Sequence, residues 1–390
     1  MDAFGGRASV IGIGESPFYK HGGATDPEFV LCLKAILAAC ADADIDPRSI
    51  DGLTSFANDR NTSLRVANAL GIKDLKWSAM QWGGGGGGTS GAVQLAAAGV
   101  ACGFAERVVA YRSVAQGQFG RFGVRPRMAG DSYYAPHGIF GAPHSFALRM
   151  NRFIEQHGAG YEAQKAVARA SYYHAQQNPH AVMHGRPLDE KTYDESRWIA
   201  EPFHLYDCCQ ENDAAAAVII APTEQARDLV EQPIPIIAAA QGNTGRSGGP
   251  IFEVYTADDW DTADFASPAS RLFKQAGLTP QDMDFVQGYT NFTGGTVMAM
   301  VDHGFCAPSE VDKFLTFENL TAPNGMLPLN TAGGMAEVYV HGMELHVEAV
   351  RQLRGQSSNP VADAKYGLVF AGPMSPPVTT TIYARADAIG

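Results

Sequence analysis

The chain has 390 residues, of which 45% are hydrophobic and 18% charged, values typical of a globular protein large enough to bury one or two cores. Its formal net charge is −12 and its pI is near 5.3. This acidic balance, without any cluster of Lys or Arg, argues against nucleic acid and anionic membranes as the main partners.

The first part of the chain predicts alternating strands and helices. The apolar run 8–14 predicts a strand, and apolar residues at helical spacing over 28–41 predict a helix after it. Residues 91–103 are small and apolar, as in a buried helix, and 107–111 follows as a strand without a polar face. Strands that are buried on both faces indicate a layered α/β fold.

The middle of the chain is less regular. Residues 113–145 are rich in Gly, Tyr, Phe, Arg and Pro and have no periodicity, which indicates a surface excursion or an active-site cover. Helical patterns resume over 146–177. The run 214–220 then predicts another buried strand, followed by a turn of helix that ends at Leu229.

The rest of the chain loosely repeats this plan. The predicted order is strand 234–240, helix 269–276, strand 285–288, helix 297–303, a Gly-rich turn at 333–334, helix 343–353 and strand 366–370. We therefore predict two similar βαβαβ-type halves, 1–230 with a loop excursion over about 113–210, and 231–390. Ligand sites in such folds lie at strand carboxyl ends and helix N-termini.

The sequence also bears on location and metal binding. It has no run of about 18 apolar residues, no signal-peptide pattern at its beginning and no targeting tripeptide at its end, so we expect a cytoplasmic protein. Its six cysteines include no CxxC pair, and Cys208-Cys209 lacks companion ligands at a metal-binding spacing. We expect reduced thiols and no metal site.

Three segments combine special backbone residues with reactive side chains. The first is the run of six glycines at 83–88, directly before the helix that begins near Thr89. The second is Gly288-Tyr289-Thr290-Asn291-Phe292, and the third runs from Leu327-Pro328-Leu329-Asn330-Thr331-Ala332-Gly333-Gly334 to Tyr339-Val340-His341-Gly342. Each segment lies at a predicted strand end or in a loop.

The third segment, followed by a helix ending in Gln352-Leu353-Arg354-Gly355, resembles the second active-site loop of the thiolase superfamily, in its sterol-carrier-protein branch. Residues 284–292 resemble the strand and loop that carry the family's His/Asn-Glu-x-Phe motif, and 207–216 resembles the end of its first half. The resemblance covers nearly the whole chain in the same motif order. It implies the five-layered α-β-α-β-α thiolase fold.

The catalytic positions differ from those of a thiolase. The family's nucleophilic cysteine lies in a Cys-x-Ser-Gly turn, which here reads Gly88-Thr89-Ser90-Gly91, so the nucleophile position carries no side chain. The His of the family's Gly-His-Pro motif falls on Tyr339, the first position of the His/Asn-Glu-x-Phe motif on Tyr289, and the acid/base cysteine on Val369. Thiolase chemistry through a thioester is therefore not expected.

This tyrosine pair is similar to the steroid side-chain aldolases of the lipid-transfer-protein group. The resemblance implies retro-aldol cleavage of a β-hydroxyacyl-CoA, with a steroid side chain or another bulky acyl group, into a ketone or aldehyde and a short acyl-CoA such as propionyl-CoA or acetyl-CoA. It also implies a homodimer formed through the first half and an OB-fold, zinc-ribbon type partner protein. No cofactor is expected besides the coenzyme A thioester of the substrate.

A retro-aldol reaction needs a base for the β-hydroxyl proton and stabilisation of the thioester oxygen, and it needs no covalent intermediate. We expect Tyr289 to be the base and Tyr339 the donor toward the enolate, or the reverse. A tyrosine would need a nearby cation or hydrogen-bond donor to act as base at neutral pH. The candidate oxyanion and substrate-binding residues are Gly88, Asn291, Gly333, Gly334, His341 and Gly372.

Other interpretations remain open at this point. Asn291, Asn330, Gly333 and Gly334 are equally typical of residues that organise tight loops, and His341 of a structural hydrogen bonder. Trp82 and the stretch 133–137 are candidates for an acyl pocket. The whole chain could instead be a thiolase relic that only binds acyl-CoA or lipid, or an acyltransferase with a thioester at residue 88.

Overall fold

The computed structural model describes residues 5–56, 59–82, 85–119, 135–244 and 260–389. The strands in these ranges are β1 (Ala8–Glu15), β2 (Tyr19–Lys20), β3 (Gly52–Phe56), β4 (Trp77–Gln81), β5 (Val108–Ala115), β6 (Trp198–Ala200), β7 (Phe203–His204), β8 (Asn212–Pro222), β9 (Ile234–Gly242), β10 (Phe285–Gly288), β11 (Tyr366–Ala371) and β12 (Val378–Ala384). The α-helices are α1 (Glu28–Asp42), α2 (Ser63–Leu70), α3 (Thr89–Ala101), α4 (Gln116–Phe119), α6 (Ala142–His157), α7 (Tyr161–Gln177), α8 (Glu190–Asp194), α9 (Thr223–Leu229), α10 (Ala266–Ala276), α11 (Thr293–Asp302), α12 (Val311–Phe314), α13 (Phe317–Leu320) and α14 (Met343–Leu353).

One large sheet runs through the described residues, in the order β10-β11-β12-β9-β1-β8-β5-β3-β4, with β2 added to β8. The order β9-β12-β11-β10 repeats the order β1-β8-β5-β3. The strand directions repeat as well, because β1–β8, β8–β5, β9–β12 and β12–β11 are antiparallel, whereas β5–β3 and β11–β10 are parallel. The two parts of the sheet thus share one topology.

The two parts of the sheet meet along a short junction. Strands β1 and β9 pair at three positions, Ala8–Ile236, Ser9–Pro235 and Val10–Ile234. Helices α3 and α14 occupy equivalent places in the two parts, since each precedes the strand (β5 or β11) that pairs in parallel with an earlier one. The boundary near residue 230 falls between β8 and β9, and as a domain boundary it stays a prediction.

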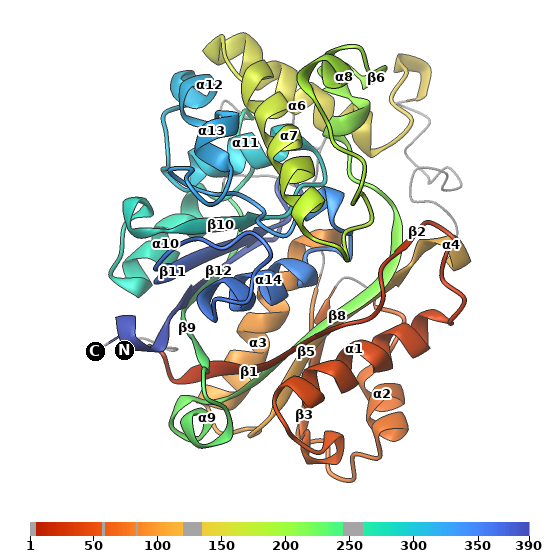
Figure 1. Ribbon diagram of the computed structural model, residues 1–390, viewed down its shortest axis with the longest axis vertical. Coiled ribbons are helices and arrows are strands. Elements are labelled where there is room, and N and C mark those ends of the chain that lie inside the picture. The colour runs from red at the N-terminus through yellow and green to blue at the C-terminus, as the bar shows by residue number, and fades with distance from the viewer. Residues whose placement is uncertain (1–4, 57–58, 83–84, 120–134, 245–259, 390) are drawn as a thin grey trace.

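The helices form layers around the two parts of the sheet. Helix α3 contacts β3, β5 and β8 on one side and β9 and β12 on the other, and α14 contacts both β8 and β11, so both helices lie between the two parts (Figure 1). Helix α1 covers the outer face of β1, β5 and β8, and α10 covers β9 and β12. The chain therefore has the predicted α/β class and α-β-α-β-α layering.

The small residues of the early strand explain how closely α1 packs. A Cβ atom added to Gly12 or Gly14 would lie 2.3 Å or 2.2 Å from the backbone of α1, at Ala39. Only glycine allows a helix backbone to approach a strand at this distance. The strand β8, with its run of alanines at 214–217, is buried almost throughout and packs between α1 and α14.

Most elements expected from the sequence are confirmed within a few residues. The helical pattern at 146–177 is two helices, because Gly158 ends α6 in the left-handed conformation at φ +66°. Strands β3, β4 and β12 and helix α2 were not expected from the sequence. Part of the expected excursion, 120–134, lies outside the described residues. In the described part of the chain, no helix combines the length and apolarity that crossing a bilayer requires.

Candidate active site

Two tyrosines from separate parts of the chain meet in the interior. Tyr289 directly follows β10, and Tyr339 lies in the segment before α14. The Tyr339 hydroxyl donates a hydrogen bond to the Tyr289 hydroxyl, and the ring centroids are 5.1 Å apart. The two residues are only 4% and 6% exposed. The sequence pointed to these two positions, and the fold brings their reactive atoms into direct contact.

Asn330 holds the segments of the two tyrosines together. Its Oδ1 accepts a hydrogen bond from the Gly288 N–H at 2.7 Å, and its Nδ2 donates to Thr290 Oγ1 at 3.2 Å. Asn330 adopts a left-handed φ of +56°, a conformation that asparagine tolerates better than most residues. Because both bonds flank Tyr289, Asn330 acts as the loop-organising residue that the sequence suggested.

The glycine run approaches the pair at Gly86. A Cβ atom on Gly86 would lie 1.9 Å from the Tyr289 hydroxyl, so any side chain here would displace the phenol. A Cβ on Gly88 would instead lie 2.6 Å from the Phe56 side chain and 3.1 Å from Gln81. That residue 88 is the vacated nucleophile position stays a prediction, but the direction of its missing side chain is away from the phenols. Gly83 and Gly84 lie outside the described residues.

The same run packs against the turn after β11. A Cβ on Gly372, which has a φ of +85°, would lie 2.2 Å from the Gly87 α-carbon. Thr379 Oγ1 in β12 donates a hydrogen bond to the Gly87 carbonyl at 2.5 Å. The predicted residue Gly372 thus supports the glycine run through backbone contact. The glycines let three backbone segments meet without intervening side chains.

Helix N-termini gather beside the tyrosines. A Cβ on Gly342 would lie 2.9 Å from Thr89 and 3.3 Å from the Tyr289 ring, which places the first residue of α3 next to the pair. Helix α14 begins directly after Gly342, and α11 begins shortly after Tyr289 in the chain. The positive ends of helix dipoles stabilise negative charge. This end of the central helices is therefore suited to an anion such as a phenolate or an enolate.

A buried arginine lies on the other side of the pair. Arg112, from the middle of β5, donates from one guanidinium nitrogen to the Phe56 carbonyl at 2.6 Å, and its Nη2 lies 3.0 Å from His341 Nδ1. The His341 ring in turn meets the Tyr339 ring edge-on at 5.6 Å. Arg112 was not among the residues predicted from the sequence, although a single arginine inside an otherwise apolar strand is a recognisable signal of function.

A thiol completes the surroundings of the pair. Cys209 adds to burial in raising the pKa of Tyr339, and its N–H donates to the Asn291 carbonyl at 3.0 Å. Burial raises the pKa of Cys209 to about 12, so the thiol is protonated at neutral pH. In the sequence, Cys209 lies in the segment 207–216 that resembles the end of the family's first half and lacks the spacing of a metal ligand, and no sequence signal connects this cysteine to Tyr339.

The two phenols are not equivalent electrostatically. Burial raises the pKa of both tyrosines well above the usual value. Cys209 raises the pKa of both phenols further. At Tyr289 the hydrogen bond from Tyr339 and the charge of Arg112 oppose this rise, whereas at Tyr339 the neighbouring Tyr289 hydroxyl adds to it. Within the pair, Tyr339 donates the hydrogen bond and Tyr289 accepts it, and the assignment of base and donor stays a prediction.

The other predicted residues lie farther from the phenols. The Asn291 side chain accepts a hydrogen bond from the Phe292 N–H at 2.8 Å, and Cβ atoms on Gly333 and Gly334 would meet Ala175 and Asn330. These contacts indicate that all three residues determine the local backbone conformation. Val369 is fully buried in the same core cluster as both tyrosines.

The remaining candidates are those expected for an acyl pocket, Trp82 and the stretch 133–137. Trp82 is 80% exposed, whereas most tryptophans in globular proteins are largely buried. Tyr133 and Tyr134, from the expected acyl-pocket stretch, lie outside the described residues. Neither position therefore defines an acyl pocket within the described structure.

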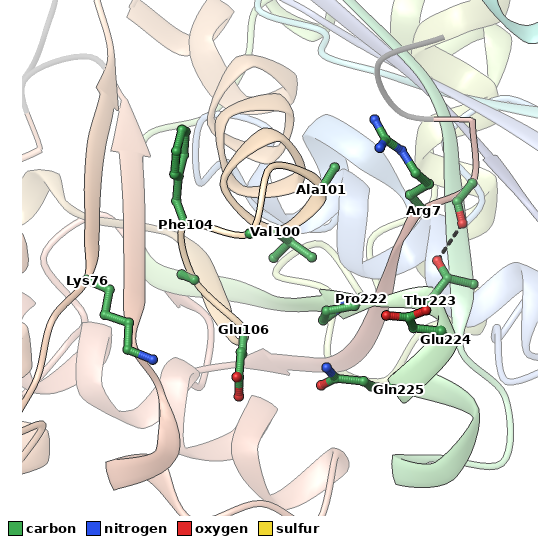
Figure 2. A pocket seen from close by; sticks show the side chains of 13 residues that line it. Arg7, Lys76, Val100, Ala101, Phe104, Glu106, Pro222, Thr223, Glu224 and Gln225 are labelled. Carbon is green, nitrogen blue, oxygen red and sulfur yellow. Dashed lines mark hydrogen bonds between the residues drawn. The ribbon is translucent and has the colours of Figure 1, made fainter. Parts of the chain in front are cut away.

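A cavity lies at the end of α3 opposite the phenols. It has a volume of about 610 Å³ and is lined by Val100 and Ala101 from that helix, together with Lys76, Glu106 and Thr223 (Figure 2). Helix α3 has 13 residues and is roughly 20 Å long, so this cavity is remote from the phenols at the N-terminal end. Its lining carries charges of both signs and includes neither Tyr289 nor Tyr339.

Comparison with known proteins places this arrangement in context. Residues 252–385 match the family model described as "Thiolase C-terminal domain-like". The chain is 38% identical to the 17-hydroxy-3-oxo-4-pregnene-20-carboxyl-CoA lyase of Mycobacterium tuberculosis, covering 94% of this chain and 96% of that protein. It is 37% identical to the steroid side-chain-cleaving aldolase of Thermomonospora curvata, covering 95% and 96%.

A solved structure agrees with these relatives. The chain superposes on the "Ltp2-ChsH2(DUF35) aldolase" with a TM-score of 0.90 at 36% identity, covering 98% of this chain and 99% of that one. The expected thiolase-type fold is thereby confirmed, and so is the resemblance to its aldolase branch.

Proposed function

The chain belongs to the thiolase-like aldolases that cleave steroid side chains, and from this premise we propose that it is a carbon-carbon lyase acting on a β-hydroxyacyl-CoA with a steroid acyl group. The observation that carries the proposed mechanism is the hydrogen bond between the Tyr289 and Tyr339 hydroxyls, beside a glycine run that offers no nucleophilic side chain. Such a site has acid and base groups and lacks the means to form a thioester at that run.

The proposed reaction begins at the β-hydroxyl. Tyr289, as the phenolate, removes the hydroxyl proton, the oxygen electrons form a carbonyl, and the bond between the α- and β-carbons breaks. The electrons of that bond pass into the thioester as an enolate. The products are a ring ketone and, after a proton returns to the α-carbon, a short acyl-CoA such as propionyl-CoA.

Stabilisation of the enolate is the second requirement. Tyr339 is the proposed donor, because its hydroxyl already donates a hydrogen bond to the Tyr289 hydroxyl. The N-terminal ends of α3 and α14 add a favourable potential for the developing charge. We propose that the chain needs no cofactor of its own, since coenzyme A enters as part of the substrate.

Partners are proposed from the relatives and from the surface. The solved aldolase on which the chain superposes is named for both Ltp2 and ChsH2, a DUF35 protein, which supports a complex with a small partner of the OB-fold, zinc-ribbon type. Strand β4 ends the sheet order, and the side chains of Leu64, Met80 and Trp82 near it are 70%, 42% and 80% exposed. An apolar edge of this kind supports a homodimer through the first half. We propose a cytoplasmic location for the assembly.

The experiment is to incubate the purified chain with a hydroxysteroid acyl-CoA thioester, with and without a DUF35-type partner, and to identify products by mass spectrometry. We expect a steroid ketone and a three-carbon acyl-CoA in equal amounts in at least one arm. Tight binding of the thioester without product in both arms would contradict the lyase and favour a relic that only binds acyl-CoA.

A further inference from the structure

Arg112 has an unusual position for a charged residue. It lies in β5, whose residues are all buried, and it is itself 6% exposed. An arginine in such a place requires partners, and those around its guanidinium include the Phe56 carbonyl at 2.6 Å, the Asp59 carboxylate at 3.5 Å and His341 Nδ1 at 3.0 Å.

Hydrogen bonds from other residues hold the Asp59 carboxylate in the position where it contacts the arginine. Its carboxylate accepts hydrogen bonds from the Asn61 N–H at 2.8 Å and from Ser55 Oγ at 3.1 Å, and the Ser113 N–H approaches at 3.4 Å. Asp59 and Phe56 therefore orient the guanidinium from the first half of the chain. The arginine side chain spans from this anchor to the segment that carries Tyr339.

The contact with Arg112 defines the tautomer of the His341 ring. An arginine nitrogen is always a donor, so Nδ1 of His341 is the acceptor and the ring proton lies on Nε2. His341 also adopts a left-handed φ of +57°, which turns its ring back against Tyr339, edge to face at 5.6 Å. Removal of the arginine would take away this contact with the ring that packs against Tyr339.

The charged and titratable groups that face Tyr289 come from several elements. They are Tyr339 before α14, Glu344 on α14, Cys209 after the 3-10 turn at Leu205–Asp207, and Arg112 on β5. Burial raises the pKa of Glu344 to about 8 and that of Cys209 to about 12, so both are largely uncharged at neutral pH. Burial lowers the pKa of Arg112 and the charge of Asp59 opposes this effect. Arg112 is the cation among these groups, because a guanidinium starts from so high a pKa that it keeps its proton even when buried.

We propose that Arg112 is a positioning residue for the tyrosine pair: through His341 it holds the Tyr339 ring in place, and its positive charge stabilises Tyr289 as the phenolate that accepts the substrate proton. The proposal rests on the proposed lyase function and adds the source of the base's reactivity. It supplies the nearby cation without which a buried tyrosine has no reason to ionise.

The test is the pH profile of kcat/KM for the lyase, assembled with its partner if the partner is required. On the acid side, the rate of the unaltered protein rises as Tyr289 ionises. In Arg112→Gln we expect this limb to move up by about one pH unit or more, which lowers kcat/KM approximately tenfold for each unit of displacement along the limb. Arg112→Lys keeps the charge with fewer donors, and its limb should lie between those of the two proteins.

Arg149→Gln is the matched control. Arg149 is also a buried arginine, 1% exposed, and it pairs with Asp264 at 3.0 Å, away from the phenols. Its variant should lose stability and leave the acid limb unmoved. If Arg112→Gln folds poorly, Arg112→Lys carries the same test with a smaller displacement.

The failure of this proposal can be told from the failure of the lyase mechanism. Suppose that Tyr289→Phe is inactive but that Arg112→Gln and Arg112→Lys have the same kcat/KM as each other at every pH. The charge of residue 112 would then have no effect, Arg112 would have only a structural role, and the inference would be wrong. If Tyr289→Phe keeps the activity and the acid limb, the assignment of the base is wrong, whatever the arginine variants do.

Discussion

The starts of α3 and α14 occupy equivalent places in the two parts of the fold, but they differ in composition: one follows a run of glycines and the other follows a segment with large polar and aromatic side chains. The turn before α3 is all glycine over Gly85–Gly88 and contributes backbone and space. The segment before α14 carries Tyr339 and His341, and the helix itself begins with Met343 and the buried Glu344. One part of the fold makes room for the reacting groups, and the other supplies most of them.

The difference explains how a thiolase-type fold can serve a reaction without a covalent intermediate. A side chain at Gly86 would occupy the place of the Tyr289 hydroxyl, so the phenol pair depends on the absence of side chains in the other part. The first part still contributes Arg112 from β5, which reaches across to His341. Changes on the two sides should therefore have distinct consequences.

The largest effect is expected on the side that carries the phenols. Tyr289→Phe and Tyr339→Phe each remove one hydroxyl of the pair, and we expect kcat/KM to fall about 10³-fold, within the usual range for the loss of a general acid or base. Steady-state kinetics and thermal unfolding measure the two consequences separately. Tyr383→Phe is the control, because it removes a buried hydroxyl that bonds His346 Nδ1 at 2.7 Å and is not one of the two phenols of the pair. Equal losses in all three variants would contradict the account.

The next effect separates two glycines of the run. Gly86→Ala places a methyl group on the Tyr289 hydroxyl and should lower kcat/KM at least about 10²-fold, because the phenol must move. Gly88→Ala meets Phe56 and Gln81, so we expect a loss of about 1–3 kcal/mol of stability from overpacking and a smaller change in rate. Kinetics and thermal melts of both variants test this ranking. The reverse order would show that residue 88 is the one that faces the substrate.

A moderate effect is expected from the proton held at the start of α14. The pKa of Glu344 is raised by burial to about 8, above its value in the unfolded chain, so the folded protein binds the extra proton between about pH 4.5 and 8. The stability from this proton is present at low pH and is lost as the pH rises toward 8, at up to about 1.4 kcal/mol per pH unit.

Glu344→Gln should remove this dependence, so that the melting temperature of the variant falls less than that of the unaltered protein between about pH 5 and pH 8. Thermal unfolding at several pH values measures the difference. Parallel curves for the two proteins would mean that Glu344 is charged in the folded state.

The smallest effect concerns the support of the glycine run. Thr379→Val removes the hydrogen bond to the Gly87 carbonyl at 2.5 Å and leaves that carbonyl without this donor, which should cost about 1–2 kcal/mol of stability. Thr381→Val, two residues along the same strand, is the matched control, because the buried Thr381 hydroxyl has no partner among the described residues. Chemical denaturation compares the two. A loss of stability at Thr381 equal to that at Thr379 would contradict this role of the Gly87 bond.

Much of this arrangement could be predicted from the sequence because it depends on local patterns. Buried runs such as 214–220 and the helix at 343–353 follow from periodicity, and the tyrosine pair follows from motif order. Strand β12 was overlooked because Thr379, Thr380 and Thr381 read as polar, whereas in the fold they are all fully buried and two of them bond to backbone carbonyls. Their burial depends on neighbours that are distant in the chain.

The contacts between segments could not be predicted. Which glycine faces Tyr289 depends on the course of the turn before α3, and a shift of two residues separates Gly86 from Gly88. Arg112 and Cys209 join the site only because β5 and the segment after Asp207 come to the same place as Tyr339. Contacts between residues so far apart in the chain cannot be predicted from motif spacing, although a buried arginine in a mainly apolar strand is a signal that can be sought.

The most direct test of the central claim is one quenched reaction in heavy water, with mass spectrometry of both the small products and the intact protein. A retro-aldol cleavage by two phenols predicts a short acyl-CoA that carries one deuterium at its α-carbon, from protonation of the enolate, and a protein of unchanged mass. A protein that has gained the mass of an acyl group, or an acyl-CoA product without deuterium, would contradict it.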